Sequence, residues 1–163
     1  MRAGDRIVPK WGYSAVGFDP DATVKASGRE LRVSPKAASE VCAAIKGMKL
    51  DEAKDFIEQV VSMKRAIPYR RYKKKVPHRH GLEKSPAGRF PIKAAQEILG
   101  VLENAEANAM HKGLDAENLR IVHASAYPGL QIKRYEPRAF GRTSPRFETL
   151  CHVEIVLEQR GET

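Results

Sequence analysis

Basic and aromatic side chains alternate through residues 64–93, called the basic insert here. The insert holds eleven Lys or Arg residues and one acidic residue, and Tyr69, Tyr72 and Phe90 lie among the cations. Aromatic rings stack on nucleobases and cations contact phosphates, so this pattern favours RNA binding over a merely solvated run of charge. The residues of the insert expected to contact RNA are Lys64, Arg65, Arg70, Arg71, Tyr72, Lys73, Lys74, Lys75, His78, Arg79, His80 and Arg89.

A second basic segment, residues 131–147, holds five basic residues and one acidic residue. It is too long for a hairpin turn and too poor in aliphatic residues to form a core. Pro137 and Pro145 stiffen it, Gly141 permits a tight bend, and Phe140 has no local core to join. We expect a narrow tongue that faces phosphate, with arginines lining both of its sides. The residues expected to contact RNA here are Lys133, Arg134, Arg138, Arg142 and Arg146.

Residues that could support catalysis or metal binding are present, but their spacing is unfavourable. His78 and His80 form an HxH pair without nearby cysteines or clustered acids, so no metal is expected. Cys151 and His152 are neighbours on a predicted strand, which places their side chains on opposite faces. Cys42 lies on the apolar stripe of a predicted helix and should be inert. The acids are dispersed over predicted helix surfaces, where they serve solubility. We therefore expect no catalytic site and no cofactor.

The charge of the chain is distributed unevenly. The 163 residues carry a formal net charge of +9 and have a pI near 9.7, which indicates a polyanionic partner. The basic insert contributes +10, residues 131–147 contribute +4, and the remaining residues sum to −5. A mildly acidic globule thus carries two basic appendages.

The composition also indicates a cellular location. The two cysteines fit reduced, apolar positions better than a disulfide framework. The chain has no apolar run of eighteen residues, and residues 1–5 lack the apolar core of a secretory signal. We expect a cytosolic protein with no membrane partner.

Hydrophobic periodicity predicts one strand, three helices and two further strands, in that order. Ser34 and Pro35 are favoured at the start of the first helix, and Gly47 can end it. Pro68 biases the preceding residue away from helix, so the second helix should fade near Ile67. In chain order we expect a strand over 24–33 broken near Gly28, a helix over 34–47, a helix from Asp51 to about 67, a basic loop over 68–90, a helix from 91 or 92 to Gly113, a strand from Leu119 and a strand over 151–157.

The longest helix should present one apolar face. Its expected members are Ala94, Ala95, Ile98, Leu99, Leu102, Ala105, Ala109 and Met110. This order of elements predicts an α+β fold, in which a small antiparallel three-stranded sheet packs against three helices and a long β-hairpin protrudes.

The expected organisation is an N-terminal arm (1–22) and a single domain (23–163), which includes the insert (64–93) and an extended hairpin (128–147). Eighteen extended residues from Leu119 would span about 60 Å. A compact domain of this size has a radius of gyration of about 15 Å. Most of the segment 128–147 should therefore project from the domain.

Several motifs in series resemble one known family. Residues 133–142 (KRYEPRAFGR) and 152–158 (HVEIVLE) resemble the hairpin and last strand of the L-twenty-two family of large-subunit ribosomal proteins. Residues 32–38 (RVSPKAA) are similar to the family's first-helix entry. Residues 88–95 (GRFPIKAA) and 103–109 (ENAEANA) are similar to the start and body of its third helix.

The basic insert refines this resemblance. Its sequences at 70–72 (RRY) and 78–81 (HRHG) look like the archaeal and eukaryotic branch, because the bacterial form lacks the insert. The chain stops soon after its last strand, without the extension of eukaryotic members, which indicates an archaeal type.

The resemblance implies a structural protein that binds 23S-type ribosomal RNA, contacts other large-subunit proteins and has no enzyme activity. It also implies that the hairpin lines the polypeptide exit tunnel and meets the nascent chain. The tip would comprise Pro137, Arg138, Ala139, Phe140, Gly141, Arg142 and Thr143, with Arg138 and Arg142 facing RNA or nascent chain. The insert carries more charge than the hairpin, so we expect it to provide most of the anchoring.

Two other functions would fit a basic chain. An RNA-processing or RNA-modifying enzyme would use the appendages to grip its substrate, but it would need a pocket with convergent His, Asp or Cys side chains. A nucleic-acid chaperone would bind duplexes regardless of sequence, and it would not need one long rigid hairpin.

Overall fold

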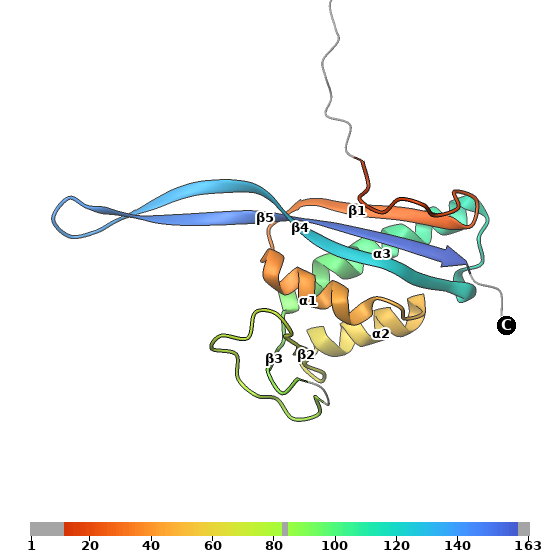
Figure 1. Ribbon diagram of the computed structural model, residues 1–163, viewed down its shortest axis with the longest axis horizontal. Coiled ribbons are helices and arrows are strands. Elements are labelled where there is room, and N and C mark those ends of the chain that lie inside the picture. The colour runs from red at the N-terminus through yellow and green to blue at the C-terminus, as the bar shows by residue number, and fades with distance from the viewer. Residues whose placement is uncertain (1–11, 83–84, 160–163) are drawn as a thin grey trace, which may run out of the picture.

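The computed structural model describes residues 12–82 and 85–159 (Figure 1). In chain order the elements are β1 (Thr23–Leu31), α1 (Pro35–Ile45), α2 (Leu50–Val61), β2 (Ile67–Pro68), β3 (Gly88–Arg89), α3 (Ile92–Lys112), the short 3-10 helix η1 (Ala116–Asn118), β4 (Leu119–Pro137) and β5 (Thr143–Gln159). The order of the long strands and helices agrees with the sequence prediction, whereas the short strands β2 and β3 were not predicted.

Strand β5 is the centre of the larger sheet, with β1 and β4 as its antiparallel neighbours. Helices α1 and α3 pack against the sheet, and α2 packs against α3 (Figure 1). The predicted α+β fold, with three helices and a three-stranded antiparallel sheet, is confirmed. The other face of the sheet, called the open face here, carries no helix in the described chain.

Alternation along β5 supplies the centre of the core. Cys151, Val153, Ile155 and Leu157 are all fully buried, as the sequence predicted. His152 is their neighbour on the opposite face, so the predicted separation of Cys151 from His152 is also confirmed.

Helix α3 covers the sheet closely because its packing face is rich in alanine. The predicted apolar face is correct except at its end, where Met110 is 60% exposed. Val101 is buried instead and packs against β1 at Gly28, where a Cβ atom would lie only 2.8 Å from Val101 Cγ2. Gly28 therefore permits the close approach of α3. Strand β1 extends to Leu31, but its pairing with β5 shifts register between Gly28 and Leu31, and Glu30 has a left-handed φ of 53°, so the predicted break near Gly28 is present as an irregularity in the strand.

Helix α2 is shorter than the sequence predicted, since it ends at Val61 and not near residue 67. Met63 adopts a left-handed conformation (φ 58°), and the next two backbone N–H groups donate to the carbonyl of Gln59. This turn releases Ile67 into the extended conformation of β2, where its side chain is fully buried. The turn at Met63, and not Pro68, therefore ends the helix.

The projecting hairpin begins where the sheet narrows from three strands to two. The last pairing of β1 joins Leu31 to Cys151. Beyond that point β4 and β5 pair only with each other, from Gln131 opposite Thr149 to Pro137 opposite Thr143. This ribbon extends well beyond the helices, as predicted (Figure 1).

Residues 12–22 form no regular element and contact the open face of the sheet. The earlier part of the predicted N-terminal arm lies outside the described residues. Ser14 holds the contact: its backbone N–H and its hydroxyl both donate to Glu154 Oε2, at 3.0 and 2.7 Å. Its hydroxyl also lies 2.6 Å from the hydroxyl of Tyr127.

These bonds form one end of a chain of side chains across the open face. Ser125 Oγ donates to the hydroxyl of Tyr127 at 2.8 Å, and His123 Nε2 lies 2.7 Å from Ser125 Oγ. Because each hydroxyl has one proton, the bonds run in a single direction, from His123 through Ser125, Tyr127 and Ser14 to Glu154. Such a chain is cooperatively strengthened and ties β4, β5 and the arm together.

Candidate nucleic-acid interface

The basic insert is anchored to the domain and is not the plain loop that its composition predicted. Its two ends pair as β2 and β3, and Ile67 and Tyr69 are buried. Ser85 Oγ donates to the carbonyl of Tyr69 at 3.2 Å. The expectation that Tyr69 offers its ring to a base is therefore wrong, because the chain uses that ring as an apolar anchor.

A buried carboxylate completes this anchoring. Glu40, on α1, is only 4% exposed. Its two oxygens accept the backbone N–H groups of Arg70 at 3.1 Å and of Arg71 at 2.9 Å. The expectation that the acids serve solubility on helix surfaces is wrong at this position. Glu40 fixes the path of the insert, and hence the place from which its cations project.

The anchored insert forms a cavity of about 550 Å³ against the start of α1. We call it the cationic pocket; its lining includes Ser34, Lys36, Arg71, Tyr72, Lys73, Lys74 and Arg89 and no acidic residue. Helix α1 begins here at Pro35 directly after Ser34, as predicted, although the Ser34 side chain makes no capping hydrogen bond. The positive end of the helix dipole adds to the cationic field.

Several cations of this region are held in place by rings and carbonyls. Lys36 Nζ lies 5.3 Å from the centre of the Tyr72 ring, and Tyr72 is 42% exposed. Arg89 donates to the carbonyl of Lys75 at 3.1 Å and lies 5.8 Å from the ring of Tyr69. A ligand therefore meets cations whose positions are already restricted, which reduces the entropy lost on binding.

The strand register places the hairpin arginines in a way that the sequence did not reveal. Arg134 on β4 is directly opposite Arg146 on β5, so the two arginines come from both strands and share one face of the ribbon. Glu136 accepts a hydrogen bond from Arg146 Nη1 at 2.6 Å. Tyr135 and Phe147 are in edge-to-face contact at 5.8 Å on the other face. The ribbon thus has an arginine face and an aromatic face.

The tip of the hairpin is a tight turn. The backbone N–H of Arg138 donates to the carbonyl of Arg142 at 2.7 Å. Gly141 has a left-handed φ of 65°, and Phe140 shares that conformation at 58° while its side chain is 98% exposed. Arg138 also lies 3.6 Å from Glu136. The tip offers cations and one solvated ring.

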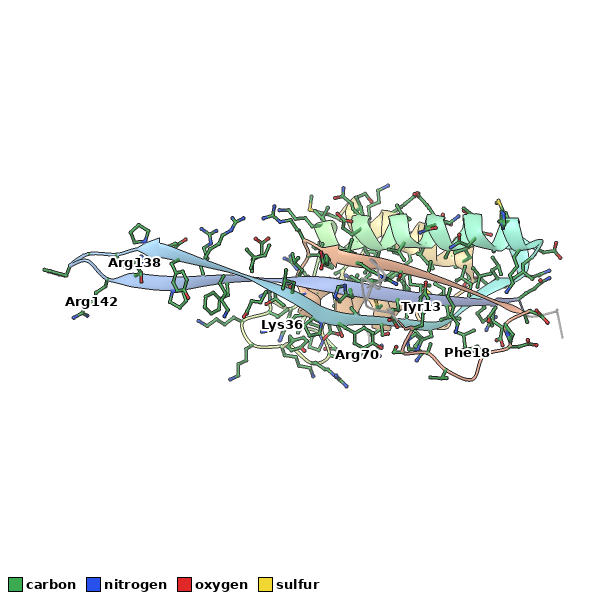
Figure 2. The ribbon with its side chains drawn as sticks, turned by 90° about the horizontal axis from the view of Figure 1, so that it is seen from above. Tyr13, Phe18, Lys36, Arg70, Arg138 and Arg142 are labelled. Atoms are coloured by element: carbon green, nitrogen blue, oxygen red, sulfur yellow. The ribbon has the colours of Figure 1, made fainter. Side chains whose placement is uncertain are left out.

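Every predicted RNA-contacting side chain is exposed, and these side chains form two groups. Figure 2 shows Arg138 and Arg142 at the far end of the hairpin, well separated from Lys36 and Arg70 on the domain. Within the insert, Arg65 lies 4.7 Å from the ring of Phe56. The structure thus gathers the insert residues around the domain and holds the hairpin arginines apart from them.

Sequence reasoning missed Lys36, Ser34 and Glu40, all on or beside α1. Ser34 and Lys36 fit the pattern of a helix start, so the sequence indicates a structural role for them and not a role in binding. Glu40 departs from the surrounding apolar stripe, but the sequence does not place residues 70–71 beside it. The missing information is therefore the contact between α1 and the insert.

Both cysteines are free and buried. Burial raises the pKa of Cys42 to about 12 and that of Cys151 to about 11. Their thiols are therefore poor nucleophiles, which agrees with the predicted inert character of Cys42. His78 and His80 belong to no group of three or more metal-ligating side chains within residues 12–82 and 85–159.

Fold and charge define a class of small basic α+β proteins in which a compact domain carries an anchored cationic insert and an extended β-ribbon. Comparison with known proteins identifies the family. Residues 26–158 match the family model described as ribosomal protein L22p/L17e, and the chain belongs to this family.

Relatives cover nearly the whole chain. The protein from Archaeoglobus fulgidus, named large ribosomal subunit protein uL22, is 58% identical over 91% of this chain and 96% of its own length. The protein of the same name from Methanopyrus kandleri is 51% identical over 92% of this chain and 96% of its own. The protein of the same name from Methanocaldococcus jannaschii is 50% identical over 88% of this chain and 92% of its own length.

These matches confirm the family resemblance and the predicted archaeal type. Membership of a ribosomal protein family also confirms the predicted location on cytoplasmic ribosomes. No helix in the described part of the chain is long and apolar enough to cross a membrane.

Proposed function

We propose that this protein is a structural constituent of the large ribosomal subunit that binds 23S-type ribosomal RNA. The relatives named above are large-subunit proteins and are matched along almost all of their length. The observation that carries the RNA-binding role is the cationic pocket, which gathers five basic side chains without one acid in its lining. Such a field requires phosphate or another dense anion as its counter-charge.

The insert and the hairpin have different roles in this proposal. The anchored insert binds RNA around the cationic pocket, through the twelve insert residues predicted from the sequence. The ribbon enters the subunit and lines the polypeptide exit tunnel, with its tip (137–143) facing RNA or nascent chain. Other large-subunit proteins are the remaining partners. Arg134 lies directly opposite Arg146, and Glu136 pairs only with the second of them in this register. The ribbon therefore keeps a net positive charge that supports an anionic environment, because like charges directly opposite destabilise a free hairpin.

The salt dependence of RNA binding tests the role of the insert. The probe is large-subunit ribosomal RNA transcribed in vitro, and the protein is the full chain. Lys73→Ala and Lys74→Ala should each reduce the slope of log K against log salt by about 1, because each phosphate contact releases counterions. Lys49→Ala is the control, since Lys49 is exposed beside α2 and away from the pocket.

Two results would contradict the proposal. One is a binding constant that does not change with salt. The other is wild-type protein that remains at the top of a sucrose gradient, apart from large subunits, at physiological salt.

A catalytic role would need an activated nucleophile or an acid–base pair in a cavity. Both described cysteines are buried with raised pKa values, so neither favours that alternative.

A further inference from the structure

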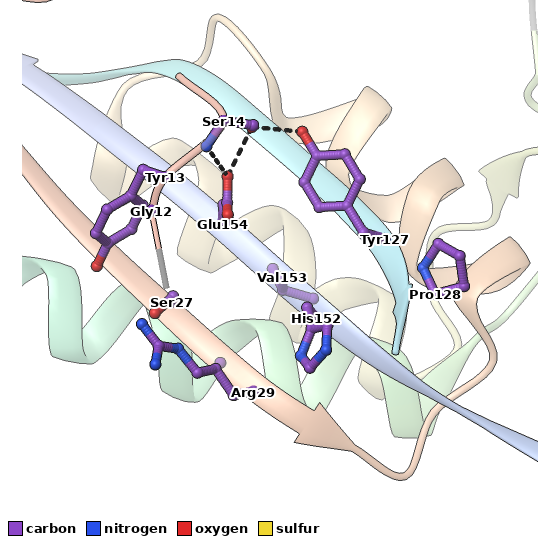
Figure 3. Close-up of a pocket in the computed structure, with 11 residues that line it drawn as sticks. Gly12, Tyr13, Ser14, Ser27, Arg29, Tyr127, Pro128, His152, Val153 and Glu154 are labelled. Carbon is purple, nitrogen blue, oxygen red and sulfur yellow. Dashed lines mark hydrogen bonds between the residues drawn. The ribbon is translucent and has the colours of Figure 1, made fainter. Parts of the chain in front are cut away.

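A second cavity lies on the open face of the sheet, where the hairpin leaves the domain (Figure 3). Its volume is about 410 Å³, and we call it the open-face pocket. Three rings and a proline line it: Tyr13 from the N-terminal arm, Tyr127 and Pro128 from β4, and His152 from β5. None of them is among the residues that the sequence assigned to RNA.

The walls of this pocket are fixed by hydrogen bonds. Ser14 joins the arm to Glu154 and Tyr127, which holds the neighbouring Tyr13 beside the sheet. In Figure 3 Tyr13 and Tyr127 stand on opposite sides of the pocket. The pocket is therefore formed before any ligand arrives, which lowers the entropic cost of filling it.

The ring of His152 is fixed as well. Its Nδ1 accepts the backbone N–H of Glu30 at 3.1 Å. A Cβ atom at position 129 would lie 2.7 Å from His152 Nε2, so Gly129 allows the ring to pack directly against the backbone of β4. Contacts on two sides orient the imidazole and leave it as one wall of the pocket.

The lining matches a nucleobase better than an aliphatic or acidic group. Planar rings stack on the faces of any base, and Arg29 and Ser27 at the rim provide hydrogen-bond donors for its edge or its phosphate. Lys25 Nζ lies 5.7 Å from the ring of Tyr13 and adds positive charge nearby. A volume of about 410 Å³ holds one base with its sugar, but not a helix or a duplex.

The open-face pocket and the cationic pocket each share lining residues with a third hollow. A hollow of about 680 Å³ lies between them at the base of the hairpin. It shares Pro128 with the open-face pocket, and it shares Arg71 and Tyr72 with the cationic pocket. The lining of this hollow also includes Arg32 and Glu148, which form an ion pair with each other. The shared residues place both pockets beside the base of the hairpin, within reach of one RNA.

We propose that the open-face pocket holds one unpaired base of the RNA whose phosphates the cationic pocket binds. This inference rests on the proposed function, and it adds a site that reads the RNA by stacking in addition to those that bind its charge. An unpaired base is needed because a base within a duplex has no free face to offer the rings.

The first test compares affinities and their salt dependence, with the full chain and in-vitro-transcribed large-subunit RNA as the probe. Tyr13→Ala should weaken binding about 5- to 100-fold, the usual effect of losing one base–ring stack. The slope of log K against log salt should not change, because no phosphate contact is lost. Tyr13→Phe keeps the ring and should bind as wild type does.

Ser27→Phe provides a second variant, which fills the cavity and removes no ring. It should cause a similar loss of affinity with an unchanged urea midpoint. If Ser27→Phe fails to fold, the comparison of Tyr13→Ala with Tyr13→Phe still tests the base pocket. Both variants should fold, because Tyr13 lies on an irregular segment outside the core.

The second test identifies the occupant directly. The photoreactive residue p-benzoylphenylalanine replaces Tyr13 in the full chain, which is assembled into large subunits and irradiated. A cross-link to one unpaired nucleotide of the ribosomal RNA is expected. Cross-links to protein alone would overturn the inference, because a peptide would then fill the pocket.

The two proposals fail in different ways. If wild-type protein does not bind the RNA, the proposed function fails. If wild type binds and Tyr13→Ala binds with equal affinity, only the base pocket is refuted.

Discussion

The buried carboxylate of Glu40 couples the stability of the domain to the position of its cations. It is 4% exposed and accepts two backbone N–H groups of the insert, at 2.9 and 3.1 Å. Replacing it with alanine removes both bonds at once. Since α1 is otherwise unaffected and alanine favours helix, the change acts mainly on the attachment of the insert.

The size of the effect follows from these two bonds. A hydrogen bond to a charged group contributes about 1.5–3 kcal/mol. The side chains of Arg70 and Arg71 are exposed, so water can partly replace the lost acceptor. We expect Glu40→Ala to lower the free energy of unfolding by about 2–4 kcal/mol. Glu40→Gln keeps one acceptor oxygen and should cost about half as much. Urea denaturation measures both values.

The RNA affinity of Glu40→Ala is a second measurement, and the direction of its change distinguishes two effects. Glu40→Ala removes a negative charge near the cationic pocket, which by itself would strengthen phosphate binding. Release of the insert should outweigh this gain and weaken binding. Glu103→Ala, at an exposed position of α3, makes the same change in charge and should change neither stability nor affinity appreciably. The reasoning would be falsified if Glu40→Ala unfolded within about 0.5 kcal/mol of wild type, or if it bound RNA more tightly.

Three further predictions concern the hydrogen bonds, the pH response and the thiols. Tyr127→Phe interrupts the side-chain chain of the open face and should cost about 1–2 kcal/mol in urea denaturation; an unchanged midpoint would show that the chain adds nothing. The hydrogen bond from Arg32 lowers the pKa of Glu148, so its stabilising effect is present above the ordinary value of about 4.3 and is lost as pH falls through the lower folded value. Arg32→Ala should therefore flatten the acid limb of stability against pH, and an identical limb in both proteins would refute this. Burial should keep Cys42 and Cys151 from reacting with iodoacetamide at pH 8 until urea unfolds the protein, and rapid labelling of the native chain would contradict their raised pKa values.

Strong periodicity explains where the sequence prediction succeeded. Alternation from Cys151 to Leu157 and the long stripe that ends at Gly113 each describe an element that buries one face, and both were confirmed. The end of α2 was predicted near Ile67 from Pro68, but the left-handed turn at Met63 ends the helix at Val61 and the fold buries Ile67 in a strand. Local pattern does not show which of two burial sites a side chain will occupy.

In the candidate interface, too, local properties were predicted correctly and tertiary contacts were not. The identity of the cations and the length of the hairpin were readable, because charge and extended length are local properties of the chain. The role of Tyr69 was misread, because an aromatic side chain among cations fits both a buried anchor and a stacking ring. Its burial depends on Ser85 and on the pairing of β2 with β3.

The sequence by itself thus determined the fold class, the family and the presence of two basic appendages. Periodicity, charge density and motif order require no knowledge of distant contacts. Only the tertiary structure decided that Glu40 anchors the insert, that Arg134 and Arg146 share a face, and that Tyr13 and His152 line one pocket. Each of these depends on residues far apart in the chain, whose meeting is set by packing and register and not by local composition.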